Sequence, residues 1–181
     1  MTTIGVAIAI PEPYGAQLRR HRASFGDLQA ETIPTHVTLV PPTDLARVSL
    51  DVVDEHLGDV AEKLPAFSMH LRGTATFRPT SPVVFVAMAE GISSCELIAG
   101  SVRSGPLQQE LDFPYHPHVT IAHDLPDSAL DLAFETLADF ECRFDVNEFQ
   151  LYVHDDDGVW RQRRAYALSP PVAAASSSGS R

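Results

Sequence analysis

The stretch "PTHVTLVPPT" at residues 34–43 returns in nearly the same form as "YHPHVTIAH" at residues 115–123. Each copy holds the tripeptide His-Val-Thr inside an apolar run, with a proline shortly before the histidine. Side chains on a β-strand alternate between its two faces, so the His and Thr of each copy share one face, and the Val and the next apolar residue share the other. We therefore predict two strands that each bury an apolar face and present an imidazole beside a hydroxyl.

The residues around the two motifs repeat one order of elements. In the first half, hydrophobic periodicity predicts a strand at 3–10, a helix at 12–26, the first motif strand at 35–40, a helix at 49–64 and a long strand at 66–77. In the second half, it predicts the same order: a strand at 83–89, a helix at 92–105, the second motif strand at 117–123, a helix at 127–140 and a long strand at 143–155. A turn at 155–158 then leads into a last strand at 159–168.

Local side chains mark three of these boundaries. The first motif strand is expected to end at Pro41-Pro42, because proline has no N–H to donate to a ladder. The helix at 49–64 is expected to begin after Ser49 as N-cap and to stop before Pro65.

This twofold order indicates an internal duplication packed as two lobes. We expect a fold of the α/β (α+β) class with antiparallel-rich sheets and outer helices, in which a pseudo-two-fold axis brings the two motif strands face to face across an active cleft. Residues 1–168 would form one bilobal domain whose halves, roughly 1–80 and 81–168, share elements. The low-complexity tail at 169–181 is predicted to be disordered.

Composition limits the partners. With 181 residues and 44% hydrophobic side chains, the chain can bury a core. Its net charge of −11 repels polyanions, so we expect no binding of long nucleic acid. Nearly all basic residues are arginines, and the cluster Arg161, Arg163 and Arg164 is either a local phosphate-facing patch or a solvated strand end.

The sequence favours a reducing compartment. The apolar N-terminal run has no Lys or Arg before it and ends at Pro11, which predicts a first strand and not a secretory signal. No stretch approaches the roughly 20 apolar residues of a membrane helix. Cys95 and Cys142 are too few for a disulfide framework, so we expect free thiols in the cytoplasm. We also expect no membrane association and a monomeric protein.

Two imidazoles that face one phosphate can divide the work of a displacement. The pKa of a free histidine is about 6.5, so either form is accessible near neutral pH. A neutral His can take a proton from water while a protonated His gives one to the departing oxygen. Threonine hydroxyls can hold the non-bridging oxygens. This scheme needs no metal and no cofactor.

The paired motif, "HVTL" at 36–39 and "HVTI" at 118–121, resembles the signature of the 2H phosphoesterase superfamily, which includes 2′-5′ RNA ligase-like and cyclic phosphodiesterase proteins. The stretches "FRPTSPVVFVAM" (77–88), "FPYHPHVTIAH" (113–123) and "LYVHDDDGVW" (151–160) look like its bacterial 2′-5′ RNA ligase-like branch. The resemblance spans roughly residues 3–168. A single His-x-Thr carries no information, whereas two in duplicated lobes are a fairly specific pattern.

The resemblance implies metal-independent opening of a cyclic phosphodiester at a nucleotide or RNA end, with 2′-5′ RNA ligation as a second activity. His36 and His118 would then be the acid–base pair, and Thr38 and Thr120 the phosphate-binding hydroxyls. A symmetric motif does not say which His is the acid.

Two further features qualify this expectation. Tyr115 and His116 precede the second motif, and either the pocket rim or an exposed strand edge would accommodate them. Relatives that act on RNA often have a basic residue soon after the second motif, where this chain has His123 and Asp124. This difference favours a small nucleotide or a short RNA end as the substrate.

Other interpretations remain open. The chain could be a nucleotide-binding module without turnover. A zinc hydrolase would need three imidazoles, and His116, His118 and His123 are the candidates, but on a regular strand the third points away from the first two. The turn at Asp155-Asp156-Asp157-Gly158 lacks the ligand spacing of a calcium loop and is expected to be a solvated hairpin tip.

Overall fold

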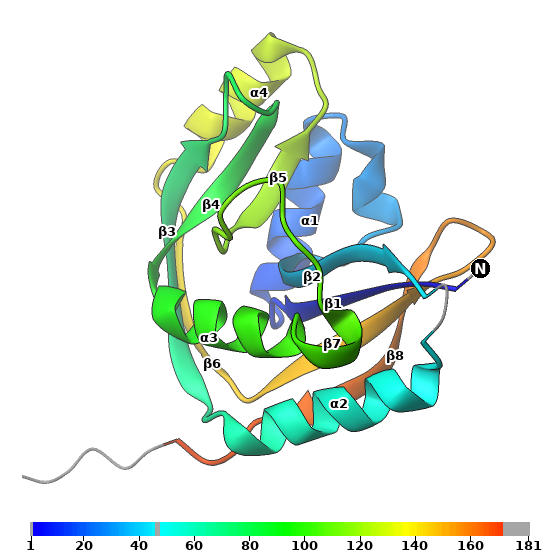
Figure 1. The fold of residues 1–181 in the computed structure, drawn as a ribbon. Helices are drawn as coiled ribbons and strands as arrows, with labels where there is room; N and C mark the ends of the chain where they lie inside the picture. Colours follow the sequence, from blue (N-terminus) through cyan, green and yellow to red (C-terminus); the bar gives the residue numbers. More distant parts are fainter. Residues whose placement is uncertain (1, 46–47, 172–181) are drawn as a thin grey trace, which may run out of the picture.

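The computed structural model describes residues 2–45 and 48–171, which form eight strands and four α-helices (Figure 1). The strands are β1 (Thr3–Ala9), β2 (His36–Asp44), β3 (Phe67–Thr76), β4 (Val83–Glu90), β5 (Val119–His123), β6 (Glu141–Val146), β7 (Glu148–His154) and β8 (Trp160–Ala167). The helices are α1 (Tyr14–Ser24), α2 (Leu50–Lys63), α3 (Ile92–Val102) and α4 (Asp127–Thr136), with short 3-10 turns η1 (Leu28–Glu31) and η2 (Gly105–Leu107).

The strands form two antiparallel sheets with equivalent orders. The first sheet is β2-β1-β7-β8 and the second is β5-β4-β3-β6. In each sheet a motif strand lies at the edge and pairs with an apolar strand, β1 or β4, which is followed by two further strands. The predicted fold class is therefore confirmed.

Each sheet takes strands from both halves of the chain. β7 and β8 come from the second half and complete the first sheet, whereas β3 comes from the first half and completes the second. Two helices also pack against strands from the other half of the chain, because α1 contacts β5 and α3 contacts β2. In Figure 1, α4 lies at the outer end of the second sheet, and α2 lies at the opposite end of the molecule.

The prediction of one long strand at 143–155 is wrong. The chain forms two strands, β6 and β7, on either side of Asn147, and they belong to different sheets. β6 pairs with β3 and β7 pairs with β1. The apolar positions change parity there, from Cys142, Phe144 and Val146 to Phe149, Leu151 and Val153. This break in the alternation is a local signal of the change of sheet, and the prediction of one strand overlooked it.

The prediction that the first motif strand ends at Pro41-Pro42 is also wrong, because β2 continues to Asp44. The ladder between β1 and β2 pairs Val6 with Val40 and then Ile4 with Thr43, so three steps on β2 match two on β1. This irregularity absorbs the prolines, and β2 is an edge strand, where a missing N–H costs little.

Helix α2 begins and ends where its side chains predict. The Ser49 hydroxyl accepts a hydrogen bond from the Val52 N–H, and the helix ends before Pro65. The other three helices lie within their predicted ranges and are a few residues shorter at one or both ends. Among the described residues, no helix is both long and apolar enough to cross a membrane.

The start of the predicted disordered tail is bound to the fold. The Ser169 N–H donates to the Leu64 carbonyl, and the Ala66 N–H donates to the Ser169 carbonyl. Most of that tail, residues 172–181, lies outside the described residues.

Candidate active site

The two motif strands are neighbours although they belong to different sheets. β2 and β5 are edge strands that contact each other where the sheets meet. His36 is the first residue of β2, and His118 directly precedes β5. The His and Thr of both motifs are half-buried, and the apolar residues that alternate with them are at most 1% exposed. The predicted alternation is therefore confirmed for both strands.

Both imidazoles are held by the same contact. Nδ1 of His36 lies 2.6 Å from the carbonyl oxygen of Pro34, and Nδ1 of His118 lies 2.7 Å from that of His116. A carbonyl oxygen only accepts, so each Nδ1 carries the hydrogen and donates it. Each Nε2 is then the nitrogen that is left to exchange a proton with a substrate.

Both histidines are less basic than a free imidazole. Burial is the main cause, and it lowers the pKa of His36 and of His118 because a buried ring is charged less readily. The carbonyl contact of each Nδ1 opposes this change. Positive charge lowers the pKa further, from Arg22 at His36 and from His116 and His36 at His118.

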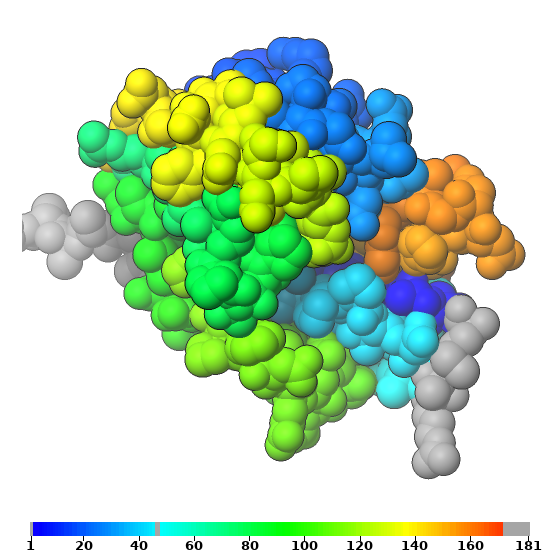
Figure 2. Space-filling model, turned by 90° about the horizontal axis from the view of Figure 1, so that it is seen from above, coloured from blue at the N-terminus to red at the C-terminus, as the bar shows by residue number. Residues whose placement is uncertain are grey.

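Two cavities meet at the motifs. One of about 420 Å³ is lined by His118 and Thr38, and one of about 80 Å³ is lined by His36 and Thr38. Thr38 thus belongs to both. The space-filling view shows a hollow where β2, the β3–β4 connection and the loop before β5 come together (Figure 2). Three of the four motif residues therefore line at least one of these two cavities.

The fourth motif residue lies slightly apart. Thr120 is half-buried on β5, opposite Phe85 of β4, and it lines neither cavity. The two flanking candidates, Tyr115 and His116, both line the larger cavity.

Tyr115 connects the two motifs directly. Its hydroxyl donates to the carbonyl oxygen of Thr38 at 2.8 Å. Burial raises the pKa of this phenol, which keeps the hydroxyl protonated as a donor. The Arg103 guanidinium lies 4.9 Å from the ring centre and covers one face of it. Since Tyr115 lies three residues before His118, it links the loop of the second motif to the strand of the first.

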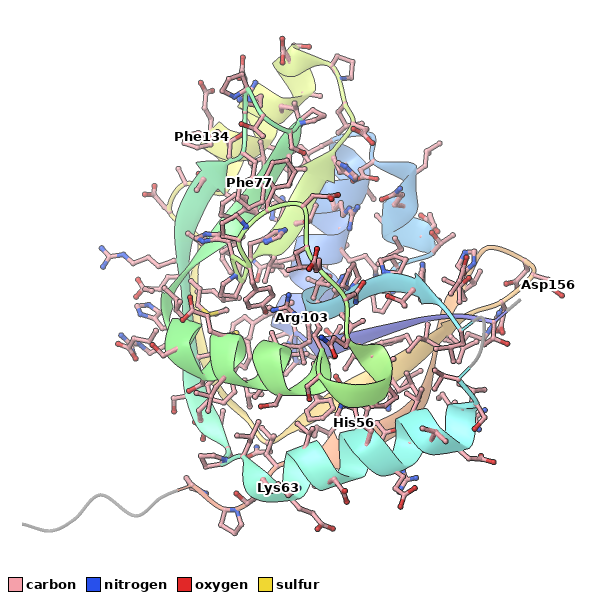
Figure 3. The ribbon with its side chains drawn as sticks, in the orientation of Figure 1. His56, Lys63, Phe77, Arg103, Phe134 and Asp156 are labelled. Carbon is pink, nitrogen blue, oxygen red and sulfur yellow. The ribbon has the colours of Figure 1, made fainter. Side chains whose placement is uncertain are left out.

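Aromatic side chains that the sequence reasoning missed surround the site. The ring centre of His118 lies 4.9 Å from that of Phe77 and 5.1 Å from that of Phe85. Phe113 lines the same cavity, and Trp160 lines the smaller one. Figure 3 shows Phe77 between the second sheet and the loop before β5. Phe113 was detectable as an aromatic residue two positions before Tyr115 in the loop that precedes the second motif, whereas Phe77 and Trp160 reach the site only through folding.

The three-histidine set of a zinc hydrolase is not assembled. His123 lines neither cavity, and its Nε2 lies 3.3 Å from the carboxylate of Asp124. Within residues 2–45 and 48–171, no group of three or more His, Cys, Asp or Glu side chains is arranged to hold a metal ion.

The arginine cluster lies away from both cavities. Arg161 pairs with Asp155 at 2.6 Å and with Asp157 at 2.7 Å, and it lowers the pKa of Asp157 to about 2. Arg163 and Arg164 lie 4.0 and 3.9 Å from the carboxylate of Asp54. These arginines thus have acidic partners within the chain, and Arg161 neutralises the acidic hairpin tip.

The chain matches a known family over most of its length. The family model of the 2′-5′ RNA ligase superfamily matches residues 10–158. The "Putative phosphoesterase" of Bacillus cytotoxicus is 25% identical over 138 residues, which cover 75% of this chain and 80% of that protein, and a protein of the same description in Bacillus mycoides matches equally.

Two solved structures have a similar fold over nearly their full length. The protein TT0787 of Thermus thermophilus has a TM-score of 0.66 at 23% identity, covering 94% of this chain and 99% of that one. Escherichia coli LigT in its apo form has a TM-score of 0.64 at 21% identity, covering 93% and 98%.

Proposed function

The chain belongs to the 2′-5′ RNA ligase superfamily, and from this premise we propose that it opens a cyclic phosphodiester, 2′,3′-cyclic or related, at a nucleotide or an RNA end. The observation that carries the proposal is the matched pair of imidazoles. His36 and His118 come from equivalent edge strands, each donates from Nδ1 to the carbonyl two residues earlier, and each leaves Nε2 available.

The two imidazoles act on opposite sides of one phosphorus atom. Nε2 of the neutral histidine accepts a proton from the attacking water, and Nε2–H of the protonated one donates a proton to the ring oxygen that leaves. The P–O bond to water forms as the P–O bond of the ring breaks, and the product is a phosphomonoester with a free hydroxyl. The same displacement with a hydroxyl in place of water forms a new phosphodiester as the ring P–O bond breaks, which is the chemistry of ligation.

The substrate itself helps to create the required charge state. Both histidine pKa values are lowered in the free protein, so both rings are mainly neutral at pH 7. An anionic phosphate between them favours the protonated form of one ring. We infer that substrate binding and protonation of the acid are coupled.

Threonine hydroxyls orient the phosphate in this scheme. Thr38 lines both cavities, and its hydroxyl is available to donate to a non-bridging oxygen. Thr120 takes the equivalent place in the second motif but lines neither cavity, so the motif alone assigns it to the same phosphate. Their role is to keep the attacking and leaving oxygens in line.

A small nucleotide or a short RNA end is the substrate that fits best. The net charge of −11 opposes long polyanions. LigT of E. coli, which shares the fold, has been solved with 3′-AMP, with ATP and with NADP+, so nucleotides bind to that protein. A monomer in the cytoplasm remains our expectation for this chain.

The test is the loss of hydrolysis of adenosine 2′,3′-cyclic phosphate in His36→Ala and His118→Ala. Each variant is expected to lose about 10²–10⁴-fold in kcat/KM, the typical contribution of general acid–base catalysis. His123→Ala is the matched control, because it removes an imidazole from β5 that lines neither cavity. Circular dichroism and thermal unfolding check that all three variants fold.

Three outcomes would contradict the proposal. Full activity in either motif variant would remove the acid–base assignment. Tight binding of a nucleotide to the parent protein in calorimetry, with no product after hours, would instead identify a nucleotide-binding module. Activity that a chelator abolishes would favour a zinc hydrolase.

A further inference from the structure

We propose that the site selects cyclic phosphodiesters whose only negative charge is the reacting phosphate, and that the larger cavity holds the nucleobase of that substrate. This inference rests on the proposed function and narrows its substrate class. It is built from the charges, the aromatic rings and the sizes of the two cavities.

No described residue in the walls of the two cavities has a side chain that is always charged. Among the described residues that line either cavity, none is Lys, Arg, Asp or Glu, and the ionisable groups are the imidazoles of His36, His116 and His118 and the phenols of Tyr115 and Tyr152. The negative charge of one bound phosphodiester is therefore balanced by the protonated imidazole of the histidine pair. A second phosphate would find no fixed cation in these walls.

Two described arginines beside the larger cavity already have partners. Arg78 follows Phe77 in the chain, but its guanidinium lies 2.8 Å from Asp131 and 3.5 Å from Asp127. Arg103 donates to the Ala99 carbonyl and covers the back of the Tyr115 ring.

Arg22 is buried and pairs with Asp27 at 2.7 Å. To bind another phosphate, any of these guanidinium groups would have to give up its present contact. Since the whole chain carries a charge of −11, an extra phosphate is repelled over longer distances as well.

Aromatic rings, in contrast, are concentrated in the larger cavity. Phe77, Tyr115 and His116 line it, and Phe113 lines it while 67% exposed. A large apolar side chain that is exposed at the mouth of a cavity indicates a binding surface. Aromatic side chains bind bases by stacking, whatever the base. The volume of about 420 Å³ lies in the range of about 300–1,000 Å³ that is usual for small-molecule pockets.

The polar groups that this cavity holds beyond the motif residues suit a nucleoside. Thr80 and Ser81 contribute hydroxyls from the β3–β4 connection, which can donate to or accept from a base edge or a ribose hydroxyl. The cavity beside His36 is much smaller, about 80 Å³, and has space for water and not for a base. The nucleoside therefore occupies the His118 side of the phosphate.

The first test compares two substrates that differ by one phosphate. We expect kcat/KM for adenosine 2′,3′-cyclic phosphate to exceed that for the same compound with a 5′-phosphate by at least about tenfold, a difference of roughly 1.4 kcal/mol. Equal rates, or a preference for the 5′-phosphorylated compound, would overturn the inference and leave the proposed function standing. Absence of turnover with both compounds would overturn the proposed function and this inference with it.

A second test adds a cation to the cavity. Thr80 is exposed on the β3–β4 connection, so Thr80→Lys is compatible with folding. We expect this variant to raise the ratio of kcat/KM for the 5′-phosphorylated compound to kcat/KM for the other compound several-fold. Leu97→Lys is the matched control, because Leu97 is 60% exposed on α3 and lines neither cavity. An equal gain in relative kcat/KM for the 5′-phosphorylated compound in both variants would mean that the net charge of the protein, and not the charge of this cavity, sets the preference. That result would overturn the inference that the 5′-phosphate is disfavoured by the walls of this cavity.

A third test removes the stacking surface. Phe113→Ala is expected to raise KM about tenfold with little change in kcat, and Phe113→Tyr to keep the parental KM, since only the stacking ring matters. Phe134→Ala, on α4 and at the outer side of the molecule in Figure 3, is the control. The Phe113→Ala defect should vanish with a base-free ribose 2′,3′-cyclic phosphate. An equal defect with and without the base would contradict the nucleobase assignment.

Discussion

Each motif histidine owes its orientation to one backbone carbonyl. In both copies the acceptor lies two residues before the histidine, at Pro34 and at His116, and Nε2 is left for chemistry. The environments of the rings nevertheless differ, because Phe77 and Phe85 lie against His118. A symmetric motif has therefore become an asymmetric pair, which is what an acid and a base require.

The lowered pKa values predict an acidic optimum. The active form needs one neutral and one protonated imidazole, and burial shifts both pKa values below the usual value of about 6.5. The protonated histidine is thus lost as the pH rises, so kcat/KM should follow a bell whose maximum lies below about pH 6.5 and should fall towards pH 8. Rates on a cyclic nucleotide between about pH 4.5 and 9 test this. A plateau that extends beyond about pH 8 would contradict the assignment.

Tyr115 is expected to act as a positioning residue. Tyr115→Phe removes the hydrogen bond to the Thr38 carbonyl and leaves the ring under Arg103 in place. The loss should lower the free energy of unfolding by about 1 kcal/mol and lower kcat by roughly 10- to 100-fold, because the two motifs are no longer held at a fixed separation. A purely structural role would change stability and leave both kcat and its pH profile as they are.

At the scale of elements, the contact between β1 and the β7–β8 hairpin shapes the cavity beside His36. Gly5 of β1 lies under the Trp160 ring, and an added Cβ would meet the ring at 3.3 Å. The Trp160 N–H also donates to the Thr32 carbonyl, which ties the hairpin to the segment that leads into β2. Residue 5, in the middle of β1, must therefore lack a side chain for the Trp160 ring to line this cavity.

Gly5→Ala should displace Trp160. We expect a loss of about 1 kcal/mol or more in the free energy of unfolding, because the ring must move, and a change in tryptophan emission, which reports this position alone since the chain has one Trp. Gly58→Ala on α2 is the matched control, because an added Cβ there meets nothing within 4 Å. It should stabilise the helix by about 0.5–1 kcal/mol and leave the emission unchanged. Unchanged emission in Gly5→Ala would contradict the contact.

At the scale of the whole molecule, the two halves interlock. Without β7 and β8, the strand β1 would lose its partner on one side, and without β3, the strand β4 would do the same. An apolar strand with an unpaired edge favours aggregation over folding. The duplication is therefore visible in the strand order and not in separable units.

Half-chains are expected not to fold. Residues 1–80 and residues 81–168, expressed separately, should give no cooperative thermal transition, whereas the full chain should unfold in one step because its sheets are shared. Circular dichroism during heating measures this. The two halves mixed together should recover the transition if the interlocked sheets form between them. A cooperative transition in either half alone would mean that the lobes are independent.

The sequence by itself determined the elements, the fold class and the two motif strands, since two-residue alternation and capping side chains are local signals that survive in any packing. It also indicated the apolar and polar faces of His-Val-Thr, which the burial of both strands confirms. Only the tertiary structure decided that β6 pairs with β3 and β7 with β1, that β2 runs through its prolines, and that Phe77, Trp160 and the Tyr115 hydroxyl reach the site. Those features depend on which strands pair across long sequence separations, and the pairing is chosen by burial of the shared core and not by any local pattern.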